Sequence, residues 1–164
     1  MSEKNDREQT GITFGAAAME DVPQLAELLK VLFGIEQDFH ADPEKQSQGL
    51  QHLISESKRG VVMTARDDTS GKIIGMVSAQ LVVSTAEGAY SAWIEDMVID
   101  EAWRAKGLGR KLLESALVWA RSRGATRAQL LVDLDNAPAL GYYDHLGWQA
   151  TRLGARRLLL KDDA

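Results

Sequence analysis

Two stretches in the first third of the chain carry apolar residues at helical spacing between capping signals. In "DVPQLAELLKVLFG", Asp21 is the expected N-cap, Pro23 falls in the first turn, and the pattern ends near Gly34. The run "DPEKQSQGLQHLISESKRG" repeats this pattern from a cap at Asp42 to a terminating Gly60. Both stretches are therefore predicted to be helices.

Two further helices are predicted in the second half, over residues 107–122 and 137–145. The first of them has charged residues on one side, including Arg110, Glu114 and Arg121. Its opposite face is apolar and comprises Leu108, Leu112, Leu113, Ala116, Leu117 and Ala120. This amphipathic pattern predicts that the helix packs on a sheet.

Strand-like runs occupy the segments between these helices. The turn-like sequences "DDTSG" and "STAEG" separate three of the runs and fit hairpins. The predicted strands cover residues 12–17, 61–65, 72–83, 89–99 and 128–132, and two short strands are expected around "RLGAR".

The order of the elements predicts an α+β fold. An antiparallel meander is followed by a strand–helix–strand crossover, which must place the strands at 89–99 and 128–132 parallel. Ligands of such crossovers tend to bind at the carboxyl ends of the strands, beside the helix N-terminus, where "RAKGLG" lies. No repeat or linker is visible, so residues 11–164 are predicted to form a single domain after a flexible tail at 1–10.

The composition narrows the classes of function. The 164 residues are 45% hydrophobic and 26% charged, which is ordinary for a globular protein. No apolar run approaches the roughly 18 residues of a membrane span, and the polar first ten residues lack the apolar segment of a signal peptide. We therefore expect a cytoplasmic protein without a membrane partner.

Metal and nucleic-acid functions are also disfavoured. The chain has no cysteine, which excludes a thiolate nucleophile and a zinc–thiolate site. Its three histidines are scattered, so no metal cofactor is expected. The net charge of −5 argues against a nucleic-acid partner, because such binding requires a basic surface.

Three kinds of phosphate-binding loop compete for the segment "RAKGLGR". The dinucleotide fingerprint G-x-G-x-x-G would need glycine where Leu112 stands, and a P-loop would need Ser or Thr after Lys111. The pattern that remains is R-x-x-G-x-G, with Arg104, Gly107 and Gly109. Such glycines let a ligand approach the N–H groups at a helix start, which suits a pyrophosphate. A tight strand-to-helix turn without a ligand is the alternative that these six residues leave open.

The sequence around this loop resembles the GCN5-related N-acetyltransferase (GNAT) superfamily. The chain reads "IEDMVIDEAWRAKGLGRKLLESAL", then a strand, then "NAPALGYYDHLGW". The superfamily signature is an apolar strand, R/Q-x-x-G-x-G/A and a helix, followed after another strand by N-x-x-A-x-x-x-Y-x-x-x-G-F. The residues in register with the second part are Asn136, Ala139, Tyr143 and Gly147.

The resemblance covers residues 94–148 and has small departures. Glu101 stands where the family often has proline, and Trp148 stands where it often has phenylalanine. The resemblance implies a three-layer GNAT fold. Its mixed, mostly antiparallel sheet would have six to seven strands, with about four helices and a splayed parallel pair of central strands.

The resemblance also implies a donor substrate, acetyl-CoA, and transfer of its acetyl group to an amine without a metal. The pantetheine arm of CoA would bond to the backbone of Met97, Val98 and Ile99, and an N–H near Val98 would stabilise the oxyanion. The pyrophosphate would bind the loop and first helical turn, made of Arg104, Ala105, Lys106, Gly107, Leu108, Gly109 and Arg110.

An ammonium acceptor must lose a proton before it attacks, so a base is required. Glu95 and Asp96 are adjacent on a strand and are expected to face opposite sides of the sheet. Acids of the family often lie on the face shared by 93, 95 and 97. Glu95 is therefore the predicted base, and Trp93 beside it is expected to raise its pKa. Asp96 and a water chain stay open as alternatives, and either acid can instead bind a cationic substrate.

Tyr143 matches the family position that often protonates the CoA sulfur. A phenol of pKa ~10 stays protonated at neutral pH and can donate as the thiolate leaves. Tyr142, one position earlier on the helix, faces about 100° away and serves as a control. Asn136 is predicted to be an N-cap that also touches the CoA arm.

The acceptor is expected near "FGIEQDFH" and the strand at 89–99, with Glu36, Asp38, Trp93 and Asp96 as substrate residues that favour a cationic amine. The predicted function is acetyl-CoA-dependent N-acetylation of a small amine. A CoA-binding sensor or interaction module without catalysis, an acetyltransferase of a protein amine, and a nucleotide-binding protein of another kind are the alternatives. Dimers are common in the superfamily, so the resemblance leaves a homodimer open.

Overall fold

The computed structural model describes residues 11–36 and 38–161. They divide into two compact units, one up to Leu130 and one from Leu131 onward. The tail predicted for residues 1–10 lies outside the described residues, and the single domain predicted for 11–164 stays a prediction.

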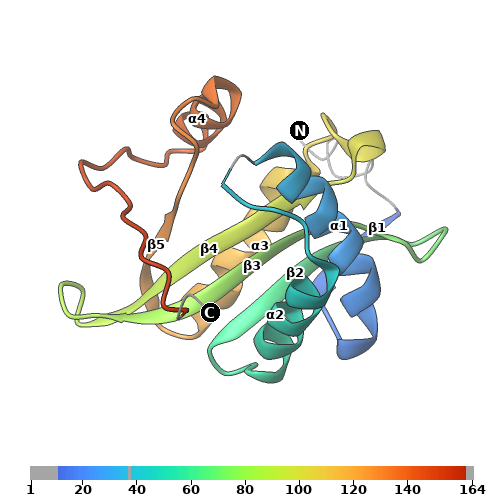
Figure 1. The fold of residues 1–164 in the computed structure, drawn as a ribbon, viewed down its shortest axis with the longest axis horizontal. Helices are drawn as coiled ribbons and strands as arrows, with labels where there is room; N and C mark the ends of the chain where they lie inside the picture. The colour runs from blue at the N-terminus through green and yellow to red at the C-terminus, as the bar shows by residue number, and fades with distance from the viewer. Residues whose placement is uncertain (1–10, 37, 162–164) are drawn as a thin grey trace, which may run out of the picture. The chain divides into compact units, whose positions relative to one another are not determined.

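The first unit is built on one five-stranded sheet with the strand order β1-β2-β3-β4-β5 (Figure 1). The first four strands pair antiparallel, and β5 pairs parallel with β4, as the crossover predicts. Both predicted hairpin turns are present. The strands are β1 (Ile12–Ala16), β2 (Gly60–Asp67), β3 (Ile73–Ser84), β4 (Ala89–Ile99) and β5 (Ala125–Leu130).

Three α-helices of this unit cover the two faces of the sheet. In Figure 1, α1 (Val22–Ile35) and α2 (Pro43–Ser55) lie in front of the strands and α3 (Leu108–Ser122) lies behind them. Two short 3₁₀ turns, η1 (Met19–Asp21) and η2 (Glu101–Trp103), precede α1 and α3. The sequence-based α+β architecture of three layers is therefore confirmed.

The two predicted helix caps behave differently. Asp42 caps α2, because its carboxylate accepts the N–H of Lys45 at 3.2 Å. Asp21 stands at the N-cap position of α1 without a side-chain capping bond. Its buried carboxylate instead accepts the N–H of Ala18 and a guanidinium N–H of Arg66, each at 2.8 Å. These bonds hold the pKa of Asp21 below its usual value although burial alone would raise it.

The core lies on both faces of the sheet. Toward α1 and α2, Val62, Met76 and Val98 pack with buried leucines of the two helices, among them Leu25 and Leu50. Each such leucine contributes roughly 1.5–3 kcal/mol when it leaves water completely. On the α3 face, Ile99 and Leu112 crowd Gly75, where an added Cβ would lie 2.6 Å from Ile99 Cδ1.

A β-bulge interrupts β4 in its last third. Met76 of β3 pairs with Val98, while Ser78 pairs with Glu95, so two residues of β4 stand opposite the single residue between them. One of the two, Asp96, has a positive φ of 53°, which is unusual for a residue other than glycine. The bulge changes which side chains of β4 point toward α1 and α2.

The second unit contains one helix, α4 (Ala137–His145). Asn136 caps it by accepting the N–H of Ala139 at 3.1 Å, as predicted. After the helix, Gly147 adopts φ 88°, which lets the N–H of Trp148 return to the carbonyl of Tyr143 at 3.0 Å.

The two short strands expected around "RLGAR" do not form in the described residues, so the sheet has five strands instead of six or seven. A strand exists only where its backbone pairs with a neighbour, and none of residues 131–161 makes such a ladder. The strand expected at 128–132 begins earlier, at Ala125, because Gly124 turns the chain directly after α3 with φ 89°.

Candidate active site

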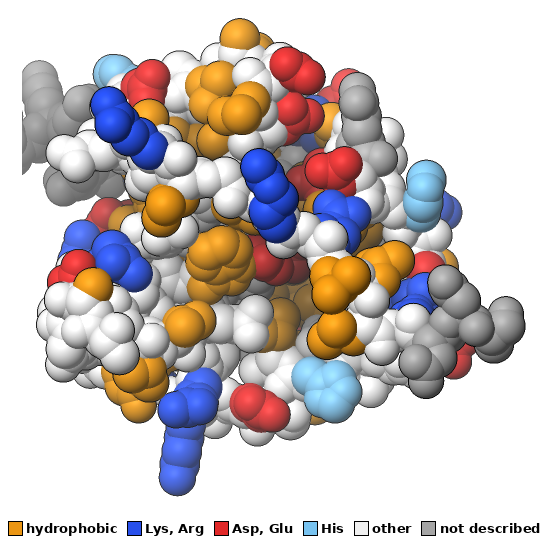
Figure 2. All heavy atoms as spheres, turned by 60° about the vertical axis from the view of Figure 1, so that its left-hand side comes forward, with side chains coloured by type: hydrophobic (Ala, Val, Ile, Leu, Met, Phe, Trp, Pro, Cys, Tyr) orange, Lys and Arg blue, Asp and Glu red, His pale blue; other side chains and the backbone are white. Residues whose placement is uncertain are grey.

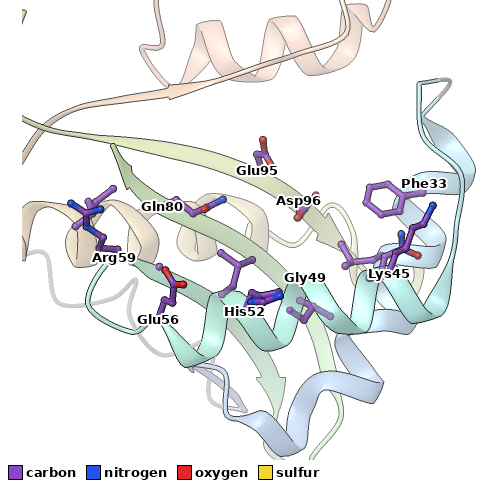
Figure 3. Close-up of a pocket in the computed structure, with 15 residues that line it drawn as sticks. Phe33, Lys45, Gly49, His52, Glu56, Arg59, Gln80, Glu95 and Asp96 are labelled. Atoms are coloured by element: carbon purple, nitrogen blue, oxygen red, sulfur yellow. The ribbon is translucent and has the colours of Figure 1, made fainter. Parts of the chain in front are cut away.

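A cavity of about 580 Å³ opens on the face of the sheet that α1 and α2 cover (Figure 3). The helices supply one wall, which includes Phe33 of α1 and His52 of α2. Gln80 of β3 and the acids Glu95 and Asp96 of β4 supply the wall made by the sheet. All of these residues belong to the first unit.

Glu95 and Asp96 both line this cavity, although adjacent strand residues were expected on opposite faces. The bulge accounts for the difference. Asp96 leaves the extended conformation at φ 53°, and the ladder resumes with Val98 instead of Met97 on the cavity side. Residues 93, 95 and 97 would share one face of a regular strand, but the bulge breaks this alternation. The carboxylates of Glu95 and Asp96 therefore line the same cavity.

Asp96 is the acid whose protonation is most altered by this environment. Burial raises its pKa to about 7, the negative charges of Glu95 and Glu36 add to the rise, and a hydrogen bond with Ser78 opposes it. A carboxyl that exchanges its proton near neutrality has the property required of a general base.

Glu95 has a different environment from the one predicted. Its carboxylate is exposed and accepts the indole N–H of Trp93 at 2.5 Å, so the ring presents a donor to Glu95 and not an apolar face. Glu36, at the end of α1, lies near enough to act on Asp96 electrostatically. Asp38 and Trp93 were also predicted to contact the substrate, but they are not among the described residues that line the cavity.

The loop between β4 and α3 has a backbone suited to an anion. Ala105 and Gly107 both adopt left-handed conformations, with φ of 60° and 76°. The helix begins at Leu108, and its first N–H groups have no intrahelical acceptor because of their position. Since the helix dipole also favours negative charge here, this loop fits the pyrophosphate of CoA.

The cationic side chains of this loop differ in the contacts they make. Arg104 donates through Nε to the carbonyl of Ile99 at 3.0 Å and so fastens the loop to the end of β4. Lys106 lies over the ring of Trp103, with Nζ 4.8 Å from the ring centroid. Arg110 is exposed, and its guanidinium engages no partner among the described residues. It is thus available to an incoming phosphate.

The pairing of β4 with β5 stops before the last residues of β4. The parallel ladder ends where Ile94 pairs with Leu130, and β5 ends at the same residue. Met97, Val98 and Ile99 therefore continue beyond the end of the neighbouring strand, and their bonding to the pantetheine arm stays a prediction.

Tyr143 and Asn136 belong to the second unit, and their catalytic and cofactor roles stay predictions. Burial raises the pKa of Tyr143, and the neighbouring Tyr142 adds to this rise. The ring of Tyr143 packs against Trp148 edge to face, with 5.9 Å between the centroids. Its phenol is therefore held in the protonated form that can donate.

Sequence reasoning missed six polar residues of the cavity: Lys45, Gln46, His52, Glu56, Arg59 and Gln80. They come from α2, from the turn after it and from β3, and no motif joins them. Only the fold brings them to the cavity that Glu95 and Asp96 line, so no local signal could have identified them.

Within residues 11–36 and 38–161, no group of three or more potential ligands is arranged to hold a metal ion. In the same residues, no helix is long and apolar enough to cross a membrane.

Comparison with known proteins identifies a family whose model matches most of this chain. The model of the "Acetyltransferase (GNAT) family" matches residues 22–148. Streptothricin acetyltransferase of Streptomyces lavendulae is 30% identical over 145 residues, which are 85% of this chain and 67% of that protein. Three further curated relatives are matched over 37%, 40% and 54% of their own lengths.

Solved structures share the fold. A possible acetyltransferase from Clostridium difficile 630 superposes with a TM-score of 0.81 at 16% identity, covering 93% of this chain and 99% of the other. A predicted acetyltransferase from Clostridium acetobutylicum, solved with acetyl-CoA, gives a TM-score of 0.72 at 18% identity over 93% and 99% of the two chains.

Proposed function

The chain belongs to the GNAT acetyltransferase family, and on this premise we propose that it transfers the acetyl group of acetyl-CoA to a primary amine of a small cationic molecule. The observation that carries the proposal is Asp96, a carboxyl with a pKa of about 7 in a cavity that it shares with Glu95. Two acids attract a cationic amine, and one of them exchanges its proton near neutral pH.

Acetyl-CoA is proposed to bind along the end of β4 and the loop that follows. Met97, Val98 and Ile99 would bond the pantetheine arm through their backbone. The pyrophosphate would lie on the N–H groups from Gly107 onward, with the charge of Arg110 beside it. The C. acetobutylicum protein solved with acetyl-CoA has the same fold, which is consistent with this donor.

The proposed reaction is a direct attack. The amine nitrogen forms a bond to the thioester carbonyl carbon, the negative charge passes to the carbonyl oxygen near the N–H of Val98, and the carbon–sulfur bond then breaks. The ammonium loses one proton to a carboxylate before it attacks, and the nitrogen loses a second proton to solvent as the amide forms. The thiolate receives a proton from Tyr143, which solvent then reprotonates. No oxidant or metal is required by this balance.

For the base we favour Asp96 over Glu95, which reverses the order expected from the sequence. Asp96 is the more buried of the two and is half protonated near pH 7. Glu95 is exposed and hydrogen-bonded to Trp93, which suits attraction of the cationic acceptor. The Streptomyces relative is named for streptothricin, and a cationic antibiotic amine belongs in the panel of acceptors to be tested.

Glu95→Gln should move the acidic limb of the pH profile of kcat/KM to lower pH. The charge of Glu95 raises the pKa of Asp96, so its removal makes Asp96 ionise more readily. Activity that rises through about pH 7 in the unmodified enzyme should then rise earlier. Profiles from pH 5 to 9 at low acceptor concentration measure this, with Glu114→Gln on the exposed side of α3 as control. An unmoved limb would contradict the coupling.

Tyr143→Phe should reduce kcat by about tenfold and leave the Kd for CoA nearly unchanged. The expected effect is modest because a thiol of pKa ~8.5 is a good leaving group that needs limited help from an acid. Tyr142→Phe is the matched control on the same helix. Released thiol gives kcat and calorimetry gives Kd. Equal kcat for the two variants would remove Tyr143 from the mechanism.

The function itself is tested by acetyl-CoA consumption with a panel of cationic antibiotics, aminosugars, polyamines, amino acids and peptides. Turnover of a small amine supports the proposal. Tight CoA binding without turnover of any amine would favour a binding module, and turnover confined to peptides would favour a protein acceptor.

Basic side chains on the face in Figure 2 are interspersed with acidic and apolar ones, which gives no special support to a nucleic-acid partner. A cytoplasmic location and a homodimer stay predictions.

A further inference from the structure

We infer that the acceptor carries an anionic group, a carboxylate or a phosphate, in addition to its reacting amine, and that Arg59 binds this group. The inference rests on the proposed function and narrows it: the reacting amine is cationic, whereas the acceptor as a whole is a zwitterion or an anion. Figure 3 shows Asp96 between Arg59 on one side of the cavity and Lys45 on the other. The carboxylates and the guanidinium are thus separated along one cavity.

Arg59 is held in place by its backbone while its side chain has no protein partner. It lies in the turn between α2 and β2, where its N–H donates to the carbonyl of Glu56 at 2.9 Å and its carbonyl accepts the N–H of Leu81 at 2.8 Å. Among the described residues, no ion pair or hydrogen bond engages its guanidinium.

Most other arginines of the first unit have a protein partner, which distinguishes them from Arg59. They donate to a protein oxygen: Arg66 to Asp21, Arg104 to Ile99, Arg121 to Glu114, Arg123 to Ser57 and Arg127 to Ser91. Within the described residues of this unit, the two that donate to none through their side chains are Arg110 and Arg59. Arg110 stands at the loop proposed for the pyrophosphate, and Arg59 faces the acceptor cavity.

The other charged groups near Arg59 define what it can bind. Lys45 is partly neutralised by Asp42, 3.8 Å away, and the Glu56 carboxylate lies on the same side of the cavity as Arg59. A planar guanidinium can donate two parallel N–H bonds to a carboxylate or a phosphate, which a lysine ammonium cannot do. Gln80 of β3 lies between Arg59 and Asp96 in Figure 3, so an uncharged amide separates the cationic part of the cavity from the acidic part.

The size of the cavity agrees with a small polar acceptor. Its volume of about 580 Å³ lies in the range of small-molecule sites. The exposed carboxylate of Glu95 and the deeper one of Asp96 receive the amine, and Phe33, beyond Asp96 from Arg59 in Figure 3, adds an apolar surface to the wall. An α-amino acid and a phosphorylated aminosugar both have this distribution of charge, and the experiment separates them.

The test compares matched acceptors that differ only in the anion: a hexosamine with its phosphate monoester, and an α-amino acid with its amide. With the unmodified enzyme we expect kcat/KM to be at least about tenfold higher for the anionic member of one pair, and that pair identifies the anion. Arg59→Gln should raise KM for that member by about 10–100-fold while kcat stays within twofold. The KM of the partner that lacks the anion should not change.

Two variants and a binding measurement complete the test. Arg59→Lys should recover part of the lost affinity, and Arg121→Gln on the exposed side of α3 should behave as the unmodified enzyme. Calorimetry with CoA present measures acceptor binding independently of turnover. Preferential binding of the anionic member without acetylation would support the inference and overturn the proposed function. Equal turnover of both members of each pair, insensitive to Arg59→Gln, would overturn the inference and leave the function standing.

Discussion

Replacing Asp96 with asparagine should lower kcat by about 10³-fold and leave the Kd for CoA within about twofold. Asparagine keeps the shape of the side chain but cannot accept the proton that the amine must lose, and general base catalysis is typically worth 10²–10⁴ in rate. Asp96 is suited to this role because burial, with the charges of Glu95 and Glu36, raises its pKa to about 7. The measurement is thiol release at pH 8 with saturating acceptor.

The same variant should be more stable than the unmodified protein at pH 8. The folded state holds the Asp96 proton up to about pH 7, whereas the unfolded chain releases it near the ordinary aspartate pKa of 3.8. The folded state therefore binds more protons between these values, and its stability falls as the pH rises through them. The ionised carboxylate costs on the order of 4 kcal/mol above pH 7. Asparagine removes that cost, so lost activity cannot be attributed to unfolding.

Glu95→Gln is the matched comparison for this prediction. Both residues line the same cavity, and both substitutions replace one carboxylate oxygen by an amide nitrogen. We expect Glu95→Gln to raise the acceptor KM and to lower kcat by less than tenfold. If Asp96→Asn kept most of the turnover while Glu95→Gln lost it, Glu95 would be the base and the order expected from the sequence would be correct.

The secondary structure was predictable wherever local chemistry decides it. The capping bond of Asp42 to the N–H of Lys45 and that of Asn136 to Ala139 are local features, and the predicted starts of α2 and α4 agree with the structure. The strand run at 89–99 agrees as well. The expected strands around "RLGAR" failed because strand formation depends on a distant partner, which the local pattern does not reveal.

The site was predictable only in part, for the same physical reason. The loop from Arg104 to Arg110 is a contiguous motif, so its backbone role could be inferred before any coordinates. The relation of Glu95 to Asp96 depends on a bulge, and the bulge depends on the register between β3 and β4. Aspartate enters the left-handed region more readily than most residues other than glycine, but its residue type alone does not locate a bulge. Arg59 reaches the cavity through tertiary structure alone.

Gly107→Val should weaken CoA binding by at least about 10²-fold. Gly107 is the N-cap residue of α3 with φ 76° and ψ 8°, a left-handed conformation that a β-branched residue adopts only under strain. Relief of that strain would turn the N–H groups of the helix start away from their common direction, and the new side chain would occupy space that a pyrophosphate needs. Several charge-assisted hydrogen bonds would be lost together.

Gly124→Val is the control for this effect, because it imposes the same kind of strain at the other end of α3. Gly124 has φ 89°, and an added Cβ there would meet nothing within 4 Å. Both variants should lose similar thermal stability, on the order of 1–3 kcal/mol, but calorimetric titration with CoA should show lost affinity for Gly107→Val alone. Equal CoA affinity in the two variants would contradict the placement of the pyrophosphate at this loop. Adding Arg104→Ala to Gly107→Val should weaken CoA binding further, because Arg104 fastens the loop to the carbonyl of Ile99.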